Sequence, residues 1–219
     1  MKVERTAAAL FLICLLSLSL VCGVEPPATV TFILSFPGAN PSHYEIVVGS
    51  DGQGLYKSDG KIDERSDAGE EASLQFTPSD KTREQIFNLA RQAHYFEGKA
   101  DSGRKNIANT GEKTLAYKDA AHDSHTTYNY STVQPVAQLT SIFQGLSTTL
   151  EFGRRLEYFH KYEKLALDNE LKKMEELQEE NMLGDIHAIE PTLRAIAKDS
   201  SVMNVSRARA LRLLASAGN

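Results

Sequence analysis

The 219-residue sequence predicts an α+β fold. We expect an antiparallel sheet of about four to six strands packed by a helix, followed by a long helix and a small helical C-terminal subdomain. Apolar and polar residues alternate in the first half of the chain, which is typical of strands with one buried face. A helix start signal near Pro78 interrupts these strands, and from Pro135 onward apolar residues recur every three or four positions.

The N-terminus has the order of a secretory signal peptide over residues 1–23. Lys2 and Arg5 precede an uncharged stretch over residues 6–22, which is short for a membrane span of about 20 residues. Cleavage after Gly23 would leave an exported chain, either periplasmic or extracellular. Two alternatives stay open: an uncleaved N-terminal anchor, and lipid modification of Cys22.

Composition excludes several classes of function. A formal net charge of −5 argues against nucleic acid as a partner, because phosphate binding calls for a basic face. The two cysteines, Cys14 and Cys22, both lie in the predicted signal peptide, so the mature chain would have no disulfide and no thiol ligand. We expect no cofactor, and membrane contact only through an uncleaved N-terminal segment.

The first strands are predicted at residues 29–36 and 43–48, followed by a hairpin turn. The dipeptide Asp51-Gly52 suits the two central positions of a type I′ turn. The turn lies in a glycine-rich stretch in which Ser-Asp-Gly occurs at residues 50–52 and again at 58–60. The implied cross-strand pairs are Val48–Leu55, Val47–Tyr56 and Gly49–Gly54.

A short strand at residues 73–76 leads into a helix from about Pro78 to His94, with Thr77 as the expected N-cap. A second hairpin joins residues 114–119 to 125–131. From Pro135 the pattern predicts either one long bent helix or two helices joined near Gly153 or Tyr162. The predicted divisions are a sheet domain over 24–134, a long helical segment over 135–183 and a helical pair over 184–219.

Residues 31–149 resemble a group of exported bacterial domains of unknown function, which have a strand, a Tyr- and Asp-Gly-containing hairpin, a helix, a second strand pair and a long helix. The residues that carry the resemblance are Tyr44, Ile46, Val48, Asp51, Gly52, Tyr56, Ile86, Ala90 and Phe96. The cysteine-rich element of many members is replaced here by "PGANPSHY". The resemblance implies the fold and export, and no activity.

Residues 186–217 are similar to a single HEAT repeat. The apolar positions that match are Ile189, Pro191 and Leu193, and then Val205, Ala208, Leu211 and Leu214. A single repeat cannot form a solenoid, which needs about three. We therefore expect this helical pair to pack on the preceding long helix.

Four sequence features are weighed as sites. The stretch around Asp51 and Gly54 continues as strand and lacks further carboxylates at calcium-loop spacing, so it predicts a turn and neither a phosphate nor a calcium loop. His122, Asp123 and His125 could share an ion, but no further ligand is near in sequence, which favours a polar loop tip. The third feature is an acidic stretch made of Glu175, Glu176, Glu179 and Glu180, which Arg207, Arg209 and Arg212 could meet within the fold. The fourth is the pair of glycosylation sequons at Asn129 and Asn204.

No nucleophile elbow or HExxH motif occurs in the sequence. We therefore assign no catalytic, cofactor-binding or metal-binding residue, and we do not expect an enzyme. The favoured function is that of a non-catalytic exported protein that acts through protein contacts, with another envelope protein as the candidate partner. The alternative is a hydrolase or a small-ligand-binding periplasmic protein with its site between the sheet and the long helix.

Overall fold

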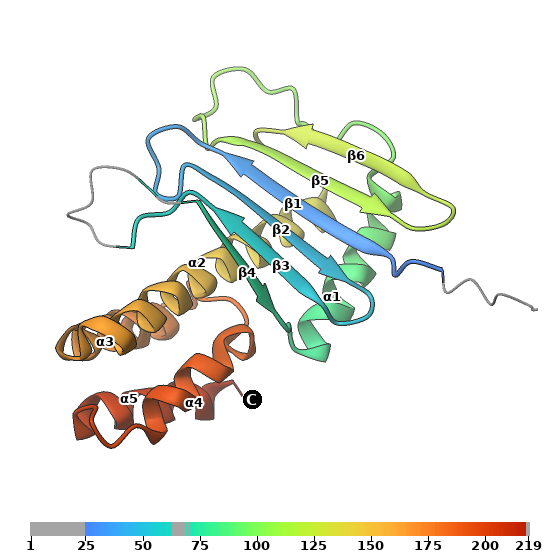
Figure 1. The fold of residues 1–219 in the computed structure, drawn as a ribbon. Helices are drawn as coiled ribbons and strands as arrows, with labels where there is room; N and C mark the ends of the chain where they lie inside the picture. Colours follow the sequence, from blue (N-terminus) through green and yellow to red (C-terminus); the bar gives the residue numbers. More distant parts are fainter. Residues whose placement is uncertain (1–24, 63–68, 70, 218–219) are drawn as a thin grey trace, which may run out of the picture.

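The structure is a computed structural model that describes residues 25–62, 69 and 71–217 (Figure 1). The predicted signal peptide and its cleavage point lie outside these residues. The fold is α+β, as predicted: the helices α1 and α2 pack against one face of a six-stranded antiparallel sheet. The helix α3 folds back along α2, and α4 and α5 pack beside these two helices.

The elements have the following bounds. The strands are β1 (Thr29–Ser35), β2 (His43–Gly49), β3 (Gly54–Ser58), β4 (Ala72–Phe76), β5 (Glu112–Lys118) and β6 (Asp123–Tyr128). The α-helices are α1 (Asp80–Gln92), α2 (Gln134–Tyr162), α3 (Leu167–Glu179), α4 (Glu190–Lys198) and α5 (Asn204–Ser216). Short 3-10 turns are η1 (His94–Phe96), η2 (Lys164–Ala166) and η3 (Ile186–Ile189).

The strands lie in the order β4-β3-β2-β1-β5-β6, and every neighbouring pair is antiparallel. The helix α1 connects β4 at one edge to β5, which pairs with β1 on the far side of the first hairpin. Alternate residues of β1, including Val30 and Phe32, are fully buried toward the helices. The predicted one-sided burial of these strands is therefore confirmed.

The turn between β2 and β3 differs from the prediction by one residue. Gly49 N donates to Gln53 O at 2.8 Å, so the loop has three residues and ends at Gly52, whose φ is +87°. The predicted pairing is wrong because it would set the outward Val47 opposite the buried Tyr56. The observed pairs are Ile46–Tyr56, Val47–Leu55 and Val48–Gly54.

The N-cap of α1 lies two residues later than predicted. Ser79, and not Thr77, is the N-cap, and its hydroxyl oxygen accepts from Thr82 N at 3.2 Å. The backbone N of Ser79 donates to Asp185 Oδ2 at 2.6 Å. This contact with a segment far along the chain holds the start of α1 at Ser79, and no local signal could have predicted it.

The long helix α2 begins with Pro135 in its first turn and ends at Tyr162, so the second of the predicted break points is the observed one. Gly153 does not break the helix. A Cβ at residue 153 would lie 2.5 Å from Ile189 Cγ2, so the missing side chain lets η3 approach α2 closely. Gly145 lets the backbone at Gly184 approach α2 in the same way. A Cβ at residue 145 would lie 3.1 Å from Gly184 N, which donates to the Gly145 carbonyl at 2.9 Å.

The buried face of α5 is not the predicted one. Ser206, Ala210 and Leu213 are buried, whereas Val205 and Leu211 of the HEAT-like pattern are 46% and 56% exposed. The helix has no strong apolar stripe of its own, so its contacts with α3 and α4 decide which side faces inward. The predicted apolar positions Val205 and Leu211 therefore lie on the outer surface.

Candidate functional site

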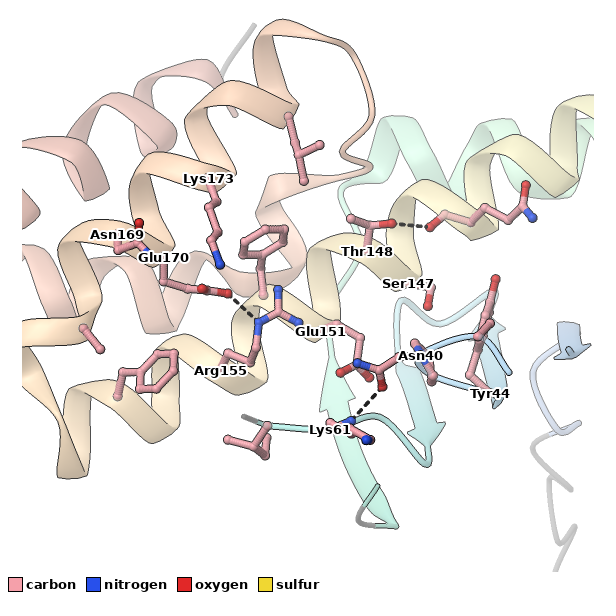
Figure 2. A pocket seen from close by; sticks show the side chains of 18 of the residues that line it. Asn40, Tyr44, Lys61, Ser147, Thr148, Glu151, Arg155, Asn169, Glu170 and Lys173 are labelled. Carbon is pink, nitrogen blue, oxygen red and sulfur yellow. Dashed lines mark hydrogen bonds and ion pairs between the residues drawn. The ribbon is translucent and has the colours of Figure 1, made fainter. Parts of the chain in front are cut away.

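A cavity of about 820 Å³ lies between α2, α3 and the loops at one end of the sheet (Figure 2). Its volume falls within the range of small-molecule sites, roughly 300–1,000 Å³. The wall from α2 includes Ser147, Thr148, Glu151, Phe152, Arg155 and Phe159. The wall from α3 includes Asn169, Glu170, Lys173 and Leu177, and the loops after β1 and β3 contribute Asn40, Pro41, Lys61 and Ile62.

A buried ion pair stands at the inner side of the α2 wall. Glu151 and Arg154 lie three residues apart on the helix, with Oε1 and Nη1 separated by 2.9 Å. Their side chains are only 7% and 8% exposed. Removing two charges from water costs several kcal/mol for each ion unless further hydrogen bonds compensate.

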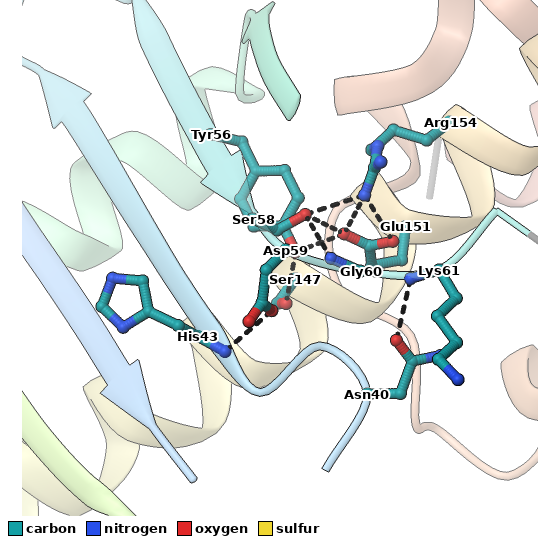
Figure 3. Close-up of polar contacts among 10 residues, drawn as sticks. All are labelled: Asn40, His43, Tyr56, Ser58, Asp59, Gly60, Lys61, Ser147, Glu151 and Arg154. Carbon is teal, nitrogen blue, oxygen red and sulfur yellow. Dashed lines mark hydrogen bonds and ion pairs between the residues drawn. The ribbon is translucent and has the colours of Figure 1, made fainter. Parts of the chain in front are cut away.

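Strand β3 supplies these compensating hydrogen bonds (Figure 3). Glu151 Oε1 accepts from the Tyr56 hydroxyl at 2.8 Å and from the Ser58 hydroxyl at 2.6 Å. Ser58 Oγ in turn accepts from Arg154 Nη1 at 2.8 Å. The single O–H of Tyr56 is donated to Glu151. In the 3.0 Å bond between Tyr56 and Ser147, the donor is therefore the Ser147 hydroxyl. The network therefore has a fixed direction of donation toward the carboxylate.

Gly60 lies directly over this network, on the side of the sheet. A Cβ at residue 60 would stand 2.6 Å from Glu151 Oε2 and 3.0 Å from Arg154 Nη1. The chain can pass over the ion pair only because residue 60 has no side chain. The second Ser-Asp-Gly of the sequence, residues 58–60, therefore borders the buried centre, whereas the first one forms the hairpin turn.

Asp59 ties together the two loops of the cavity wall. Its carboxylate accepts from the Ser42 hydroxyl and from His43 N, the latter at 2.9 Å. Burial raises the pKa of Asp59, but the hydrogen bonds from Ser42 and His43 outweigh it and hold that pKa below its usual value. Lys61 N donates to Asn40 Oδ1 at 2.9 Å. The loop after β1 and the loop after β3 thus form one connected wall.

Two buried tyrosines lie at the sheet side of the site. Burial raises the pKa of Tyr44 well above its usual value. Burial and the neighbouring Glu151 carboxylate do the same for Tyr56. Both hydroxyls therefore stay protonated at neutral pH, and the hydroxyl of Tyr56 donates to Glu151.

A second ion pair joins α2 to α3 across the cavity. Arg155 Nε bonds to Glu170 Oε1, and the Glu170 side chain is 7% exposed. The guanidinium carbon of Arg155 lies 4.4 Å from the centre of the Phe152 ring. Arg155 is thus held both by a carboxylate and by an aromatic face, and it lies within the lining of the cavity (Figure 2).

This arrangement is suited to holding a polar molecule. The walls offer paired charges, side-chain amides and aromatic rings, which is the usual composition of a binding site. The Glu151 carboxylate already has three hydrogen-bond donors, so it is poorly placed to take a proton from a substrate. Among the described residues, neither Ser58 nor Ser147 bonds to a histidine.

The turn at residues 50–52 lies at the hairpin tip, outside the cavity lining. Asp51 Oδ1 accepts from Gln53 N at 3.0 Å, which is an ordinary turn contact. The turn leads into the strand β3 and not into a helix. Its position between two strands agrees with the turn that the sequence predicts there.

The histidine cluster is spread out in the structure. His122 Nδ1 lies 3.1 Å from Asp119 Oδ1, and its ring stacks on Tyr95 with 4.1 Å between the ring centres. Asp123 pairs with Lys118, and His125 is exposed on β6. Within residues 25–62, 69 and 71–217, no group of three or more His, Cys, Asp or Glu residues could hold a metal ion.

The predicted meeting of basic and acidic segments is confirmed for two of the three arginines. Arg209 bonds to Asp168 at 2.9 Å and also to Glu175, and Arg212 bonds to Glu175 at 2.8 Å. The prediction is wrong for Arg207, whose Nε donates to a backbone carbonyl at the end of α4. Arg207 lies on the side of α5 that faces α4, so it does not reach α3.

The two sequons differ in their surroundings. Asn129 Oδ1 accepts from Thr110 N at 2.9 Å, and its Nδ2 donates to Ala108 O at 3.1 Å. The amide of Asn129 that would carry a glycan is therefore engaged in the fold. Asn204 is exposed at the start of α5.

Sequence reasoning missed Glu151, Arg154 and Arg155 as site residues. A signal was present in the sequence, because Glu151 and Arg154 lie among the apolar residues Leu150, Phe152 and Leu156. A glutamate and an arginine three residues apart can pair along a helix. Charged pairs inside an apolar helical stretch therefore point to a buried polar centre.

The sequence matches no protein-family model, and no curated protein matches it. The resemblance to exported bacterial domains therefore stays a prediction. None of the helices in the described part of the chain has both the length and the apolar character of a membrane span. The proposal of function therefore depends on the geometry of the cavity.

Proposed function

We propose that the chain is an exported, non-catalytic binding protein that holds a small molecule in the cavity between α2, α3 and the sheet. The proposal of export depends on the signal-like N-terminus. The observation that carries the binding role is the cavity of about 820 Å³ with ion pairs built into its walls.

The buried charges support a role beyond stability. Glu151, Arg154 and Glu170 are all less than a tenth exposed, and a buried ion pair seldom stabilises a fold more than apolar residues of equal volume would. The side chains of Glu151 and Arg154 are also each fixed by several hydrogen bonds. A wall of fixed polar groups beside aromatic rings is what a preorganised binding site requires.

The test is recovery of a bound molecule from the mature chain purified from its native host. We expect native mass spectrometry to show a mass above that of the polypeptide, and denaturation to release the ligand. Thr148→Trp, which fills the cavity from α2, should abolish the added mass. Ser141→Trp is the matched control, because Ser141 is exposed on the same helix and outside the cavity lining. No added mass in the unmodified chain would contradict the proposal.

A second candidate function is protein docking through α5, with another envelope protein as partner. The outward face of this helix carries Val205 and Leu211, 46% and 56% exposed, with the partly buried Ala208 between them. Val205→Lys/Leu211→Lys should then reduce the capture of one identified host protein, and Thr148→Trp should not. The opposite pattern would favour the cavity.

A further inference from the structure

Arg155 is the side chain of the cavity whose geometry is most restricted. Its Nε bonds to Glu170, and its guanidinium lies against the Phe152 ring with 4.4 Å between the guanidinium carbon and the ring centre. The salt bridge fixes the position of the planar group, and the ring fixes its tilt. An arginine held in this way loses little further freedom when it binds a ligand.

The other side of the same guanidinium is available to a ligand. In the described part of the chain, neither Nη atom of Arg155 donates a hydrogen bond to a protein group. The residue is 22% exposed, and Figure 2 shows it in the middle of the cavity with one dashed line, to Glu170. The two Nη atoms present parallel N–H groups, the arrangement that carboxylate and phosphate oxygens accept bidentately.

The charges around the cavity favour an anion. Lys61 and Lys173 line it from opposite walls together with Arg155 (Figure 2). The lining also has three acids, but one of them, Glu151, has Arg154 as a counter-ion from outside the lining. With Arg154 included, four cations and three acids surround this cavity, although the whole chain carries a formal charge of −5.

The lining of the cavity also includes apolar side chains. Phe152, Phe159 and Leu177 contribute to it, so an uncharged ligand body would be buried against them while its charged end meets the guanidinium. We propose that the cavity binds a small organic oxyanion, a carboxylate or a phosphate monoester, through the Nη side of Arg155. This inference rests on the proposed binding function and names the chemical class of its ligand.

Three probes with the same ring test the proposal: benzoate, phenyl phosphate and the neutral benzamide. Each is titrated into the mature chain by calorimetry at low salt. We expect at least one of the two anions to bind roughly tenfold or more tightly than benzamide, the difference expected from charge-assisted hydrogen bonds. A preference for benzoate alone identifies a carboxylate, and a preference for phenyl phosphate alone identifies a phosphate ester.

The variant is Arg155→Gln/Glu170→Gln, which removes both charges so that no buried carboxylate is left unpaired. It should lose the preference for the anion while it still unfolds cooperatively and keeps its affinity for benzamide. The matched control is Arg194→Gln/Glu190→Gln on α4, an exposed pair with the same Nε to Oε1 geometry at 2.5 Å. The control should leave the preference unchanged.

The outcomes separate this inference from the binding function. If neither anion binds better than benzamide, or if the preference survives in Arg155→Gln/Glu170→Gln, the oxyanion assignment is wrong. Recovery of a neutral molecule from the native protein also overturns it, but leaves the binding function intact. Recovery of no molecule from the native protein contradicts the binding function, and this inference falls with it.

Discussion

Glu151 Oε1 and Arg154 Nη1 lie 2.9 Å apart on one side of α2, where both side chains are less than a tenth exposed. The pair is satisfied by Tyr56 and Ser58 of β3, which are more than 90 residues away in sequence. The long helix and the sheet are therefore joined by polar contacts as well as by apolar packing.

Glu151→Gln should lower the free energy of unfolding by about 3–5 kcal/mol, because it leaves the buried Arg154 without a counter-ion. Urea denaturation followed by circular dichroism measures the change. The control is Glu157→Gln, an exposed position two turns along α2. Glu151→Met/Arg154→Met should be less destabilised than the single variant, and a single variant within about 0.5 kcal/mol of the unmodified chain would show that the pair is not truly buried.

Gly153→Ala tests whether close packing or helix propensity decides stability at this position, because the two predict changes of opposite sign in the free energy of unfolding. In an isolated helix this change stabilises by about 1 kcal/mol. Here a Cβ would stand 2.5 Å from Ile189 Cγ2, so we expect a loss of about 1–3 kcal/mol. Thermal unfolding of Gly153→Ala with and without Ile189→Ala is the measurement. The second change should offset part of the loss, and a stabilised Gly153→Ala would contradict the close packing of η3 on α2.

Arg209→Glu should lower the melting temperature, because Arg209 bonds to both Asp168 and Glu175 of α3. We expect a loss of about 2 kcal/mol, or roughly 4–8 °C for a chain of this size. Arg207→Glu is the control on the same helix, since its guanidinium does not reach α3. Equal melting temperatures for the two variants would rule out the α3–α5 ion pairs as a stabilising contact.

Asp119 should contribute to loss of stability in acid. Desolvation raises its pKa, but hydrogen bonds from Ala121 N, His122 N, the His122 ring and the Tyr117 hydroxyl outweigh it and lower that pKa to about 2. A carboxyl whose folded pKa lies below its unfolded value of 3.8 stabilises the fold above pH 3.8, and this stabilisation is lost as the pH falls toward 2.

The measurement is the urea midpoint at a series of pH values from about 5 down to 2. Asp119→Asn should give a shallower decline than the unmodified chain over this window. Asp123→Asn, at the exposed neighbouring position on β6, is the control and should not change the slope. Parallel pH curves for Asp119→Asn and the unmodified chain would contradict the assignment.

The sequence predicted the type and order of most elements because their signals are local. Alternation identified β1 and β2, the Pro78 region identified α1, and spacing from Pro135 identified α2. The register of the first hairpin and the N-cap of α1 were wrong by one and two residues. The first depends on which residues face the helices, and the second on a contact between Ser79 and Asp185, so neither is set by nearby sequence.

The outward face of α5 and the residues of the buried centre were missed for a related reason, although a site between the sheet and the long helix was one of the alternatives. Arg209 and Arg212 turn one side of α5 toward α3, which leaves Val205 and Leu211 outside. The buried centre joins residues of β3 to residues of α2 at separations of 93 to 96 positions. No motif spans such a distance, and only the finished sheet brings Ser58 to Glu151.

The cavity takes its walls from the loops after β1 and β3 and from the helices α2 and α3, and its last lining residue along the chain is Leu177. The cavity therefore cannot form before the chain has folded as far as α3. The proposed export in extended form would therefore take place before the cavity exists. A molecule held by the proposed binding function would be acquired on the far side of the membrane, as the final step of maturation.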